Sequence, residues 1–211
     1  MEKESKILEA AQTVFLRYGF RRVTMNDIAE EAGMSRPALY LVFANKEEVF
    51  KGAVKQFSGQ ILEEIRHGLD RRASAEEKLR YVFELWAVRP FETIQSSPDA
   101  RDLIGYGQGF AKPVMDEIYQ SFEEMLAGIL KPLMNDGTWT ALSAEQLARL
   151  LTNSVQGFKE SAGTAAELRQ MIDGLLTLTL VALDPSHVQM RREVRPRRAR
   201  HGGRRVARPK Q

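Results

Sequence analysis

Residues 24–43 read TMNDIAEEAGMSRPALYLVF. Apolar residues spaced three and four apart predict two short helices, over 25–32 and 36–42, with the turn Gly33-Met34-Ser35 between them. Gly33 suits the positive φ that such a turn requires, and Ser35 suits the cap of the second helix, whose first turn tolerates Pro37. The window therefore predicts a helix-turn-helix, with an ordinary helical hairpin at the end of a bundle as the alternative.

The same spacing divides this window into an inner and an outer face. The inner face is expected to hold Ile28, Ala29, Ala32, Leu39 and Val42. The outer face is expected to hold Arg36, Ala38, Tyr40 and Leu41. A short helix that presents Arg, a small residue and Tyr near its N-terminus fits the major groove of DNA. The helix N-terminus and Thr24 can donate hydrogen bonds to phosphates.

The segments on either side extend this unit. A helix over 3–18 is expected to cover it with an apolar stripe of Ile7, Ala11, Val14, Phe15 and Tyr18. A helix over 46–66 starts with Lys46, a cation that opposes the helix dipole unless an anion such as a phosphate lies nearby. Residues 1–50 carry seven basic and eight acidic side chains, which fits the reading of one DNA site better than general attraction to polyanions.

These residues resemble the N-terminal domain of the tetracycline-repressor (TetR) family of bacterial transcriptional regulators. The family pattern is roughly T-x-x-D-I-A-x-x-A-G-[VM]-S-x-x-x-[LV]-Y-x-[YH]-F-x-[SN]-K-E-x-[LV], and this chain matches it at Thr24, Asp27, Ile28, Ala29, Ala32, Gly33, Met34, Ser35, Leu39, Tyr40, Phe43, Asn45, Lys46, Glu47 and Val49. The resemblance implies phosphate contacts from Thr24, Tyr40 and Lys46. It implies base contacts from Arg36, Pro37 and Ala38, and Ser35 and Leu41 complete the expected DNA-binding set. Val42 departs from the usual Tyr or His, so it is expected to serve packing instead.

The whole chain is expected to be all-α, with about nine helices. The predicted spans are 3–18, 25–32, 36–42, 46–66, 75–95, 100–110, 113–134, 144–159 and 164–183. Five capping boxes mark helix starts, at Thr24/Asp27, Asn45/Glu48, Ser74/Glu77, Ser143/Gln146 and Thr164/Glu167. The expected organisation is a helix-turn-helix domain over 1–50 with its motif at 24–43, a ligand-binding and dimerisation domain over 51–185, and a basic, unstructured tail over 186–211.

The last two predicted helices are the most apolar part of the chain. The helix over 164–183 carries apolar residues beyond a single face, so it needs cover on two sides, which a second subunit or a central position in the core would supply. In the TetR family the last two helices form the dimer interface, and the resemblance therefore favours a homodimer. The expected interface comprises Leu147, Leu151, Val155, Phe158, Met171, Leu175 and Leu178. Two-fold symmetry predicts an operator that is an inverted repeat.

Large aromatic residues gather in the middle helices. They are either core or the wall of an apolar pocket for a small effector, with Gln108, Gln120 and Asn153 as candidate polar contacts. The candidate pocket residues are Trp86, Phe91, Tyr106, Phe110, Tyr119, Phe122 and Trp139. In the family, an inducer bound in such a pocket changes the spacing of the two DNA-reading heads.

Composition excludes several other classes. The 211 residues include no cysteine, which removes disulfides and thiolate chemistry and fits a reducing, cytoplasmic compartment. Neither a secretory signal nor a membrane span is expected. The net charge of +3 is uneven: residues 191–211 carry +9 and the rest about −6. This tail leaves open a second hypothesis, that of a protein that binds nucleic acids without sequence preference.

An enzyme is the third hypothesis, and the sequence does not favour it. Gly105 to Gly109 follows no strand and lacks the spacing of a dinucleotide-binding loop. Glu64 and His67 have the spacing of one half of a di-iron site, but a second such pair is missing. No cofactor, metal or catalytic residue is therefore expected. The sequence predicts a dimeric DNA-binding repressor, released by a small apolar or amphipathic effector.

Overall fold

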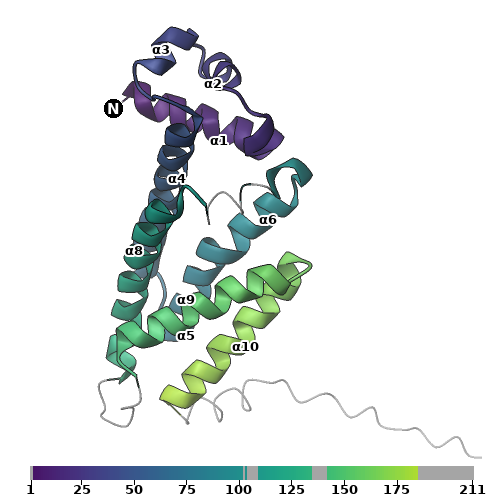
Figure 1. Ribbon diagram of the computed structural model, residues 1–211. Helices are drawn as coiled ribbons and strands as arrows, with labels where there is room; N and C mark the ends of the chain where they lie inside the picture. Colours follow the sequence, from purple (N-terminus) through teal and green to yellow (C-terminus); the bar gives the residue numbers. More distant parts are fainter. Residues whose placement is uncertain (1, 102, 104–108, 135–141, 185–211) are drawn as a thin grey trace, which may run out of the picture.

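A computed structural model describes residues 2–101, 103, 109–134 and 142–184. Over these residues the fold is all-α, as expected, with no strand. Helices α1 (Glu2–Arg22), α2 (Met25–Glu31) and α3 (Arg36–Tyr40) form a small head at one end of the molecule (Figure 1). Helix α4 (Lys46–Leu69) starts beneath this head and runs from it along the rest of the protein.

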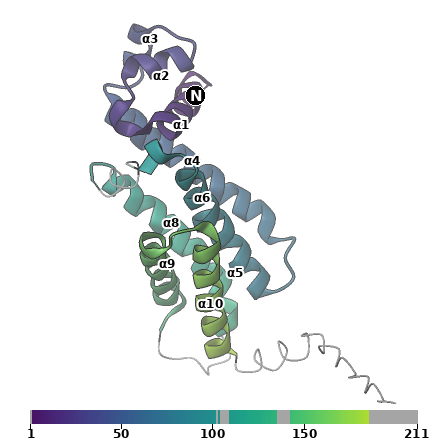
Figure 2. The same cartoon turned by 90° about the vertical axis from the view of Figure 1, so that its right-hand side faces the viewer.

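The remaining helices form a bundle around the far part of α4 (Figure 2). They are α5 (Ala75–Phe83), α6 (Arg89–Gln95), α8 (Lys112–Leu130), α9 (Ala144–Ser161) and α10 (Ala165–Leu183), with 3-10 turns at Pro98–Arg101 and Lys131–Met134. Helices α9 and α10 are antiparallel neighbours at the end farthest from the head. Among the described residues, no helix combines the length and the apolar character that crossing a membrane would require.

The buried side chains form two clusters. The head cluster contains Ile7, Ala11, Val14, Phe15, Phe20, Ile28, Leu39 and Val49. The bundle cluster contains Ile65, Phe83, Trp86, Phe122, Leu126, Leu151, Leu168 and Leu176. The predicted stripe of the first helix is confirmed except at Tyr18, which is exposed. Gly19 has φ 73° and bends α1, so that the helix continues to Arg22 and buries Phe20 instead.

All five predicted helix starts are capped, three of them reciprocally. Thr24/Asp27, Ser74/Glu77 and Ser143/Gln146 form complete capping boxes. Asn45 and Thr164 accept from the expected backbone N–H groups, but their partner acids bond elsewhere. Glu48 pairs with Lys51, and Glu167 accepts from the backbone N–H of Gly163. The sequence thus predicted each helix start correctly. Whether the acid or amide three residues later also accepts from the N-cap backbone N–H depended on the other partners available to it.

Two predicted spans differ from the structure. The single helix expected over 75–95 contains a π-helical turn, Glu84–Val88, in which the N–H of Arg89 donates to the carbonyl of Glu84. Pro90 lacks the N–H that a regular helix would direct to the carbonyl four residues earlier, and this wider turn accommodates it. The helix expected over 100–110 lies largely outside the described residues, and at its edges the structure has the 3-10 turn and a turn at 109–111. The basic tail also lies outside the described part.

Candidate DNA-binding face and ligand pocket

The turn between α2 and α3 has the geometry of a helix C-terminus closed by glycine. Gly33 has φ 64°, its N–H donates to the carbonyl of Glu30 at 2.9 Å, and the N–H of Met34 donates to the carbonyl of Ala29 at 2.9 Å. These two bonds form a Schellman motif, in which a residue with positive φ ends the helix. The Ser35 hydroxyl then accepts from the N–H of Ala38 at 3.3 Å and starts α3. The predicted helix-turn-helix geometry is confirmed.

Helix α3 presents an exposed polar face. The Arg36 guanidinium donates to the hydroxyl of Tyr40 at 3.4 Å and lies 5.5 Å from the centre of its ring. Leu41, the C-cap residue, is 84% exposed. Beneath this face, Ile28, Ala29, Ala32 and Leu39 are buried as expected. An apolar side chain as exposed as Leu41 gains nothing from the protomer's own core, whereas in a major groove it can contact a thymine methyl group.

Val42 does not have the packing role expected of it. Helix α3 ends at Tyr40 instead of continuing to residue 42, and the Val42 side chain is exposed. Phe43 packs against the head cluster in its place. The predicted inner face therefore ends at Leu39, because the chain leaves the helix before the next inward position.

Two of the expected phosphate contacts have partners within the protein. The Thr24 backbone N–H and hydroxyl both donate to one carboxylate oxygen of Asp27, at 2.7 and 2.8 Å. The Lys46 ammonium donates to the carbonyls of Phe20 and Val23, each at 2.7 Å, and lies 4.3 Å from the centre of the Phe20 ring. These carbonyls lie at the end of α1, so the cation that opposes the dipole of α4 is stabilised by the end of another helix. One ammonium hydrogen remains for a phosphate oxygen.

A large cavity lies between the head and the bundle. Its volume is about 1680 Å³, and α4, α6, α8 and α9 form its walls. Head residues reach it as well, since Gln12, Phe15, Leu16 and Phe50 line one side. A molecule in the cavity would therefore contact the helix-turn-helix head and the bundle at once.

The aromatic residues predicted to line a pocket separate into four groups. Trp86, Phe91 and Tyr119 line the cavity. Phe122 lies behind Trp86, its ring stacked at a centroid distance of 4.2 Å, and does not reach the surface. Phe110 belongs to the head, where its ring lies 5.2 Å from Phe20 and 5.6 Å from Phe50. Tyr106 and Trp139 lie outside the described residues. Of the suggested polar contacts, Gln120 and Asn153 line the cavity, and Gln108 lies outside the described residues.

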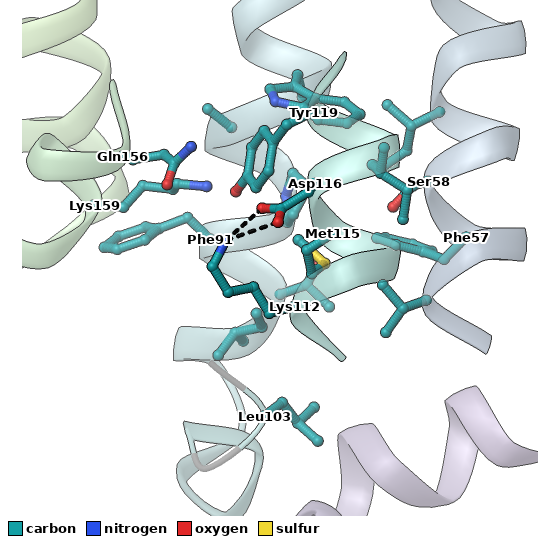
Figure 3. Close-up of a pocket in the computed structure, with 18 of the residues that line it drawn as sticks. Phe57, Ser58, Phe91, Leu103, Lys112, Met115, Asp116, Tyr119, Gln156 and Lys159 are labelled. Atoms are coloured by element: carbon teal, nitrogen blue, oxygen red, sulfur yellow. Dashed lines mark hydrogen bonds and ion pairs between the residues drawn. The ribbon is translucent and has the colours of Figure 1, made fainter. Parts of the chain in front are cut away.

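Several polar residues of the cavity carried no recognisable signal in the sequence. Figure 3 shows Gln156 and Lys159 extending from α9 toward Tyr119 and Asp116 on α8. Lys112 pairs with Asp116 at 2.7 Å. Burial raises the pKa of the Tyr119 hydroxyl and lowers the pKa of the Lys159 ammonium. Spacing alone could not identify these residues, because they come from two helices and meet only in three dimensions.

The structure corrects part of the expected dimer interface. Leu147, Leu151 and Val155 are buried in the protomer's own core and have no surface to offer a partner. Phe158, Met171 and Leu175 are partly buried against the same core. Leu178 is 72% exposed, and Leu150, which the predicted interface did not include, is 51% exposed. The apolar surface on the outside of α9 and α10 is thus narrower than predicted, and it includes Leu150, which the predicted interface left out.

The spacing that suggested a di-iron site serves a structural purpose. Glu64 forms a two-point ion pair with Arg89, at 2.6 and 3.0 Å, and this guanidinium lowers the pKa of the Glu64 carboxyl. His67 is exposed. In the described part of the chain, no group of three or more His, Cys, Asp or Glu residues is placed to hold a metal ion.

The capped turn, the exposed face of α3 and the cavity beneath the head define a helix-turn-helix DNA-binding protein with a second, pocket-forming domain. Comparison with known proteins agrees. The family model described as "Bacterial regulatory proteins, tetR family" matches residues 7–53. The HTH-type regulator YfiR of Bacillus subtilis is 46% identical over 54 residues, about a quarter (26%) of each chain. The fatty acid metabolism regulator protein of the same organism is 29% identical over 146 residues, 64% of this chain and 70% of that one.

Solved structures extend the likeness to the whole fold. A putative transcriptional regulator from Pseudomonas aeruginosa matches with a TM-score of 0.66 at 20% identity, over 88% of this chain and 92% of that one. FadR of Bacillus subtilis, in complex with stearoyl-CoA, matches with a TM-score of 0.57 at 22% identity, over 88% and 96%. Residues 7–53 thus match the DNA-binding domain of the TetR family of transcriptional regulators, and the solved structures share the fold of the chain as a whole.

Proposed function

We propose that this protein is a repressor that binds an inverted-repeat operator as a homodimer and is released when a small amphipathic molecule enters the cavity. The observation that carries the proposal is that the cavity is shared. Phe15, Leu16 and Phe50 of the head and Trp86, Phe91 and Tyr119 of the bundle line the same space. A ligand can shift an equilibrium only by interacting differently with two states, and a ligand that touches both domains is able to do so.

The outer surface of α9 and α10 supports the homodimer. The short connection at 162–164 makes these helices antiparallel, so Leu150 and Leu178 lie at similar distances from the turn. Gly174 lies one helical turn before Leu178, and nothing lies within 4 Å of where its side chain would start. A mid-helix glycine costs about 1 kcal/mol relative to alanine, so an approaching second helix accounts for it better than the protomer does. The complex of FadR with stearoyl-CoA supports an effector of amphipathic type, and the choline complex of a regulator from Saccharomonospora viridis supports a small-molecule effector in general.

Selection of sequences from a randomised duplex pool tests the operator. The purified protein should enrich one motif with two-fold symmetry at near-physiological salt, because a two-fold dimer places two α3 helices on one side of the duplex. Enrichment of an asymmetric motif would contradict the dimeric arrangement. Salt-sensitive binding without any enrichment would instead favour binding through the basic tail.

Arg36 is expected to read a base. Arg36→Ala should weaken operator binding by about 1–3 kcal/mol and relax the preference at a single position of each half-site, because a bidentate contact to guanine would be lost. Measuring affinity for the selected operator and for its single-base variants checks this. Arg36→Lys is the matched control, since it keeps the charge and loses the fork geometry, and it should also lose the preference. An equal loss on every sequence would identify a phosphate contact instead.

A further inference from the structure

Lys159 is a cation in the cavity to which the described residues offer no partner. It lies near the end of α9, and its side chain extends into the space between α9 and α8 (Figure 3). Within the described part of the chain it forms no hydrogen bond and no ion pair, and loss of solvent is the sole cause that lowers the pKa of its ammonium. The Lys159 side chain is partly buried, and a partly desolvated ammonium without a counter-charge costs free energy in the empty protein.

The neighbouring charges do not compensate Lys159. On α8, Asp116 pairs with Lys112 at 2.7 Å and Glu117 pairs with Lys55 at 3.5 Å. Glu123 pairs with Arg149 of α9 at 3.9 Å. Glu160, the next residue on α9, also lines the cavity, but it is exposed to solvent and forms no ion pair with Lys159, since adjacent helical residues point about 100° apart. Tyr119, which faces Lys159 across the cavity, is neutral at physiological pH because burial raises its pKa further.

The rest of the wall is largely apolar. Phe91 lies beside Lys159, and Met115, Phe57 and Leu103 continue the apolar lining of the same cavity (Figure 3). The volume of about 1680 Å³ exceeds the roughly 300–1,000 Å³ of common small-molecule sites, so an extended tail can be accommodated. Gln156 and Tyr119 add polar groups on the same side as the ammonium.

We propose that the effector is an anionic amphiphile whose head group pairs with Lys159 and whose apolar tail lies along Phe57, Phe91, Leu103 and Met115. This inference rests on the proposed function, since it names the chemical class of the ligand for the same cavity. The anion replaces the hydration that burial takes from the Lys159 ammonium. The side chains of Gln156 and Tyr119 donate hydrogen bonds to the second oxygen of the anion. A cationic ligand such as choline is disfavoured, because Lys159 repels it and Asp116 is already neutralised by Lys112.

The test measures direct binding of dodecanoate, dodecan-1-ol and choline by calorimetry, without DNA. The protein should bind dodecanoate about tenfold or more tighter than the alcohol, because hydrogen bonds to charged groups are the stronger ones. Lys159→Met should abolish that preference, and Lys159→Arg should retain it. The matched control is the double variant Lys112→Met, Asp116→Asn, which removes a lysine from the same cavity without changing its net charge and should keep the preference.

Dodecanoyl-coenzyme A separates two sources of the anion. If it binds more tightly than dodecanoate and depends on Lys159, the head group recognised is a phosphate, and if the free acid is preferred, it is a carboxylate. Either result supports an anion site. Equal affinity for acid and alcohol, tight binding of choline, or a preference that survives in Lys159→Met would overturn it. Binding that depends on Lys159 but never releases DNA would overturn the effector role proposed above and leave the anion site standing.

The pH dependence of ligand binding distinguishes an anion-binding lysine from a merely structural one. Dodecanoate stays ionised above about pH 6, while Lys159 loses its proton at a pKa below the ordinary 10.5. The preference for acid over alcohol should therefore fall as the pH rises through that lowered pKa. The free protein shows the opposite linkage: a lowered lysine pKa destabilises the fold below that pKa and ceases to do so as the pH rises. Lys159→Met should thus raise the melting temperature of the ligand-free protein at pH 7, whereas a structural role for the lysine would lower it.

Discussion

Leu178→Glu should leave the protomer folded and weaken operator binding by more than about a hundredfold, because in the proposed dimer it places an unpaired carboxylate in an apolar interface. Leu178 is 72% exposed in the protomer, so the substitution costs little there. A two-fold interface contains the change twice, which makes the loss larger than for a single contact. Sedimentation should show a monomer, and a duplex carrying the selected operator reports the affinity.

Gln60→Glu is the control for Leu178→Glu, since it adds the same charge at an exposed position on α4. It should leave both the sedimentation and the affinity unchanged. A Leu178→Glu protein that remains dimeric and binds the operator normally would show that the subunits meet elsewhere. Unfolding of the variant protomer would contradict the exposure on which the prediction rests.

Phe122→Ala should lower the free energy of unfolding by about 3–5 kcal/mol, since large-to-small substitution in a packed core removes buried area and leaves a cavity. Phe122 is fully buried, stacked on Trp86 with an interplanar angle of 5° and in edge contact with Phe83 at 5.8 Å. Trp86 also lines the ligand cavity, so removal of its support should alter the cavity wall as well. Urea-induced unfolding without ligand measures the change in stability.

Phe57→Ala provides the comparison for Phe122→Ala. It deletes the same ring from a cavity residue that is 38% exposed, and it should cost less than about half as much because less area leaves water on folding. Equal losses for the two variants would mean that the stacking of Phe122 and Trp86 contributes nothing beyond local packing. Phe57 lines the cavity directly, whereas Phe122 supports it from behind. Comparing the two variants therefore separates a loss of stability from a change in the cavity wall.

Local features of this fold are readable from the sequence, and contacts between distant segments are not. The turn at Gly33 and the caps at Thr24 and Ser35 depend on residues within three or four positions, so the spacing predicts them correctly. Lys46 differs, because its partners are carbonyls 23 and 26 residues earlier. Its position in the first turn of a helix suggested a phosphate, and no sequence pattern pointed to the end of α1.

Apolar periodicity has the same limit in the bundle. It identified α9 and α10 as unusually apolar, but it could not say which side faces the protomer's own core. Leu147 and Leu151 lie on the inner side, whereas Leu150, between them in the sequence, faces outward. The aromatic residues separate in a similar way: Trp86 lines the cavity, Phe122 lies behind it and Phe110 belongs to the other core. Which neighbour covers a face is decided by the tertiary fold.

Residues that follow α6 in the sequence pack against the head, and this has a consequence for evolution. Phe110 and Ala111 complete the cluster around Phe20 and Phe50, and the Ser97 hydroxyl donates to the carbonyl of Leu16 at 2.6 Å. Transplanting the first 50 residues onto another regulator's bundle would leave an aromatic socket open to water. A chimaera would need to inherit the segment around residues 97–111 together with the head, so the unit that recombination can exchange is discontinuous in the gene.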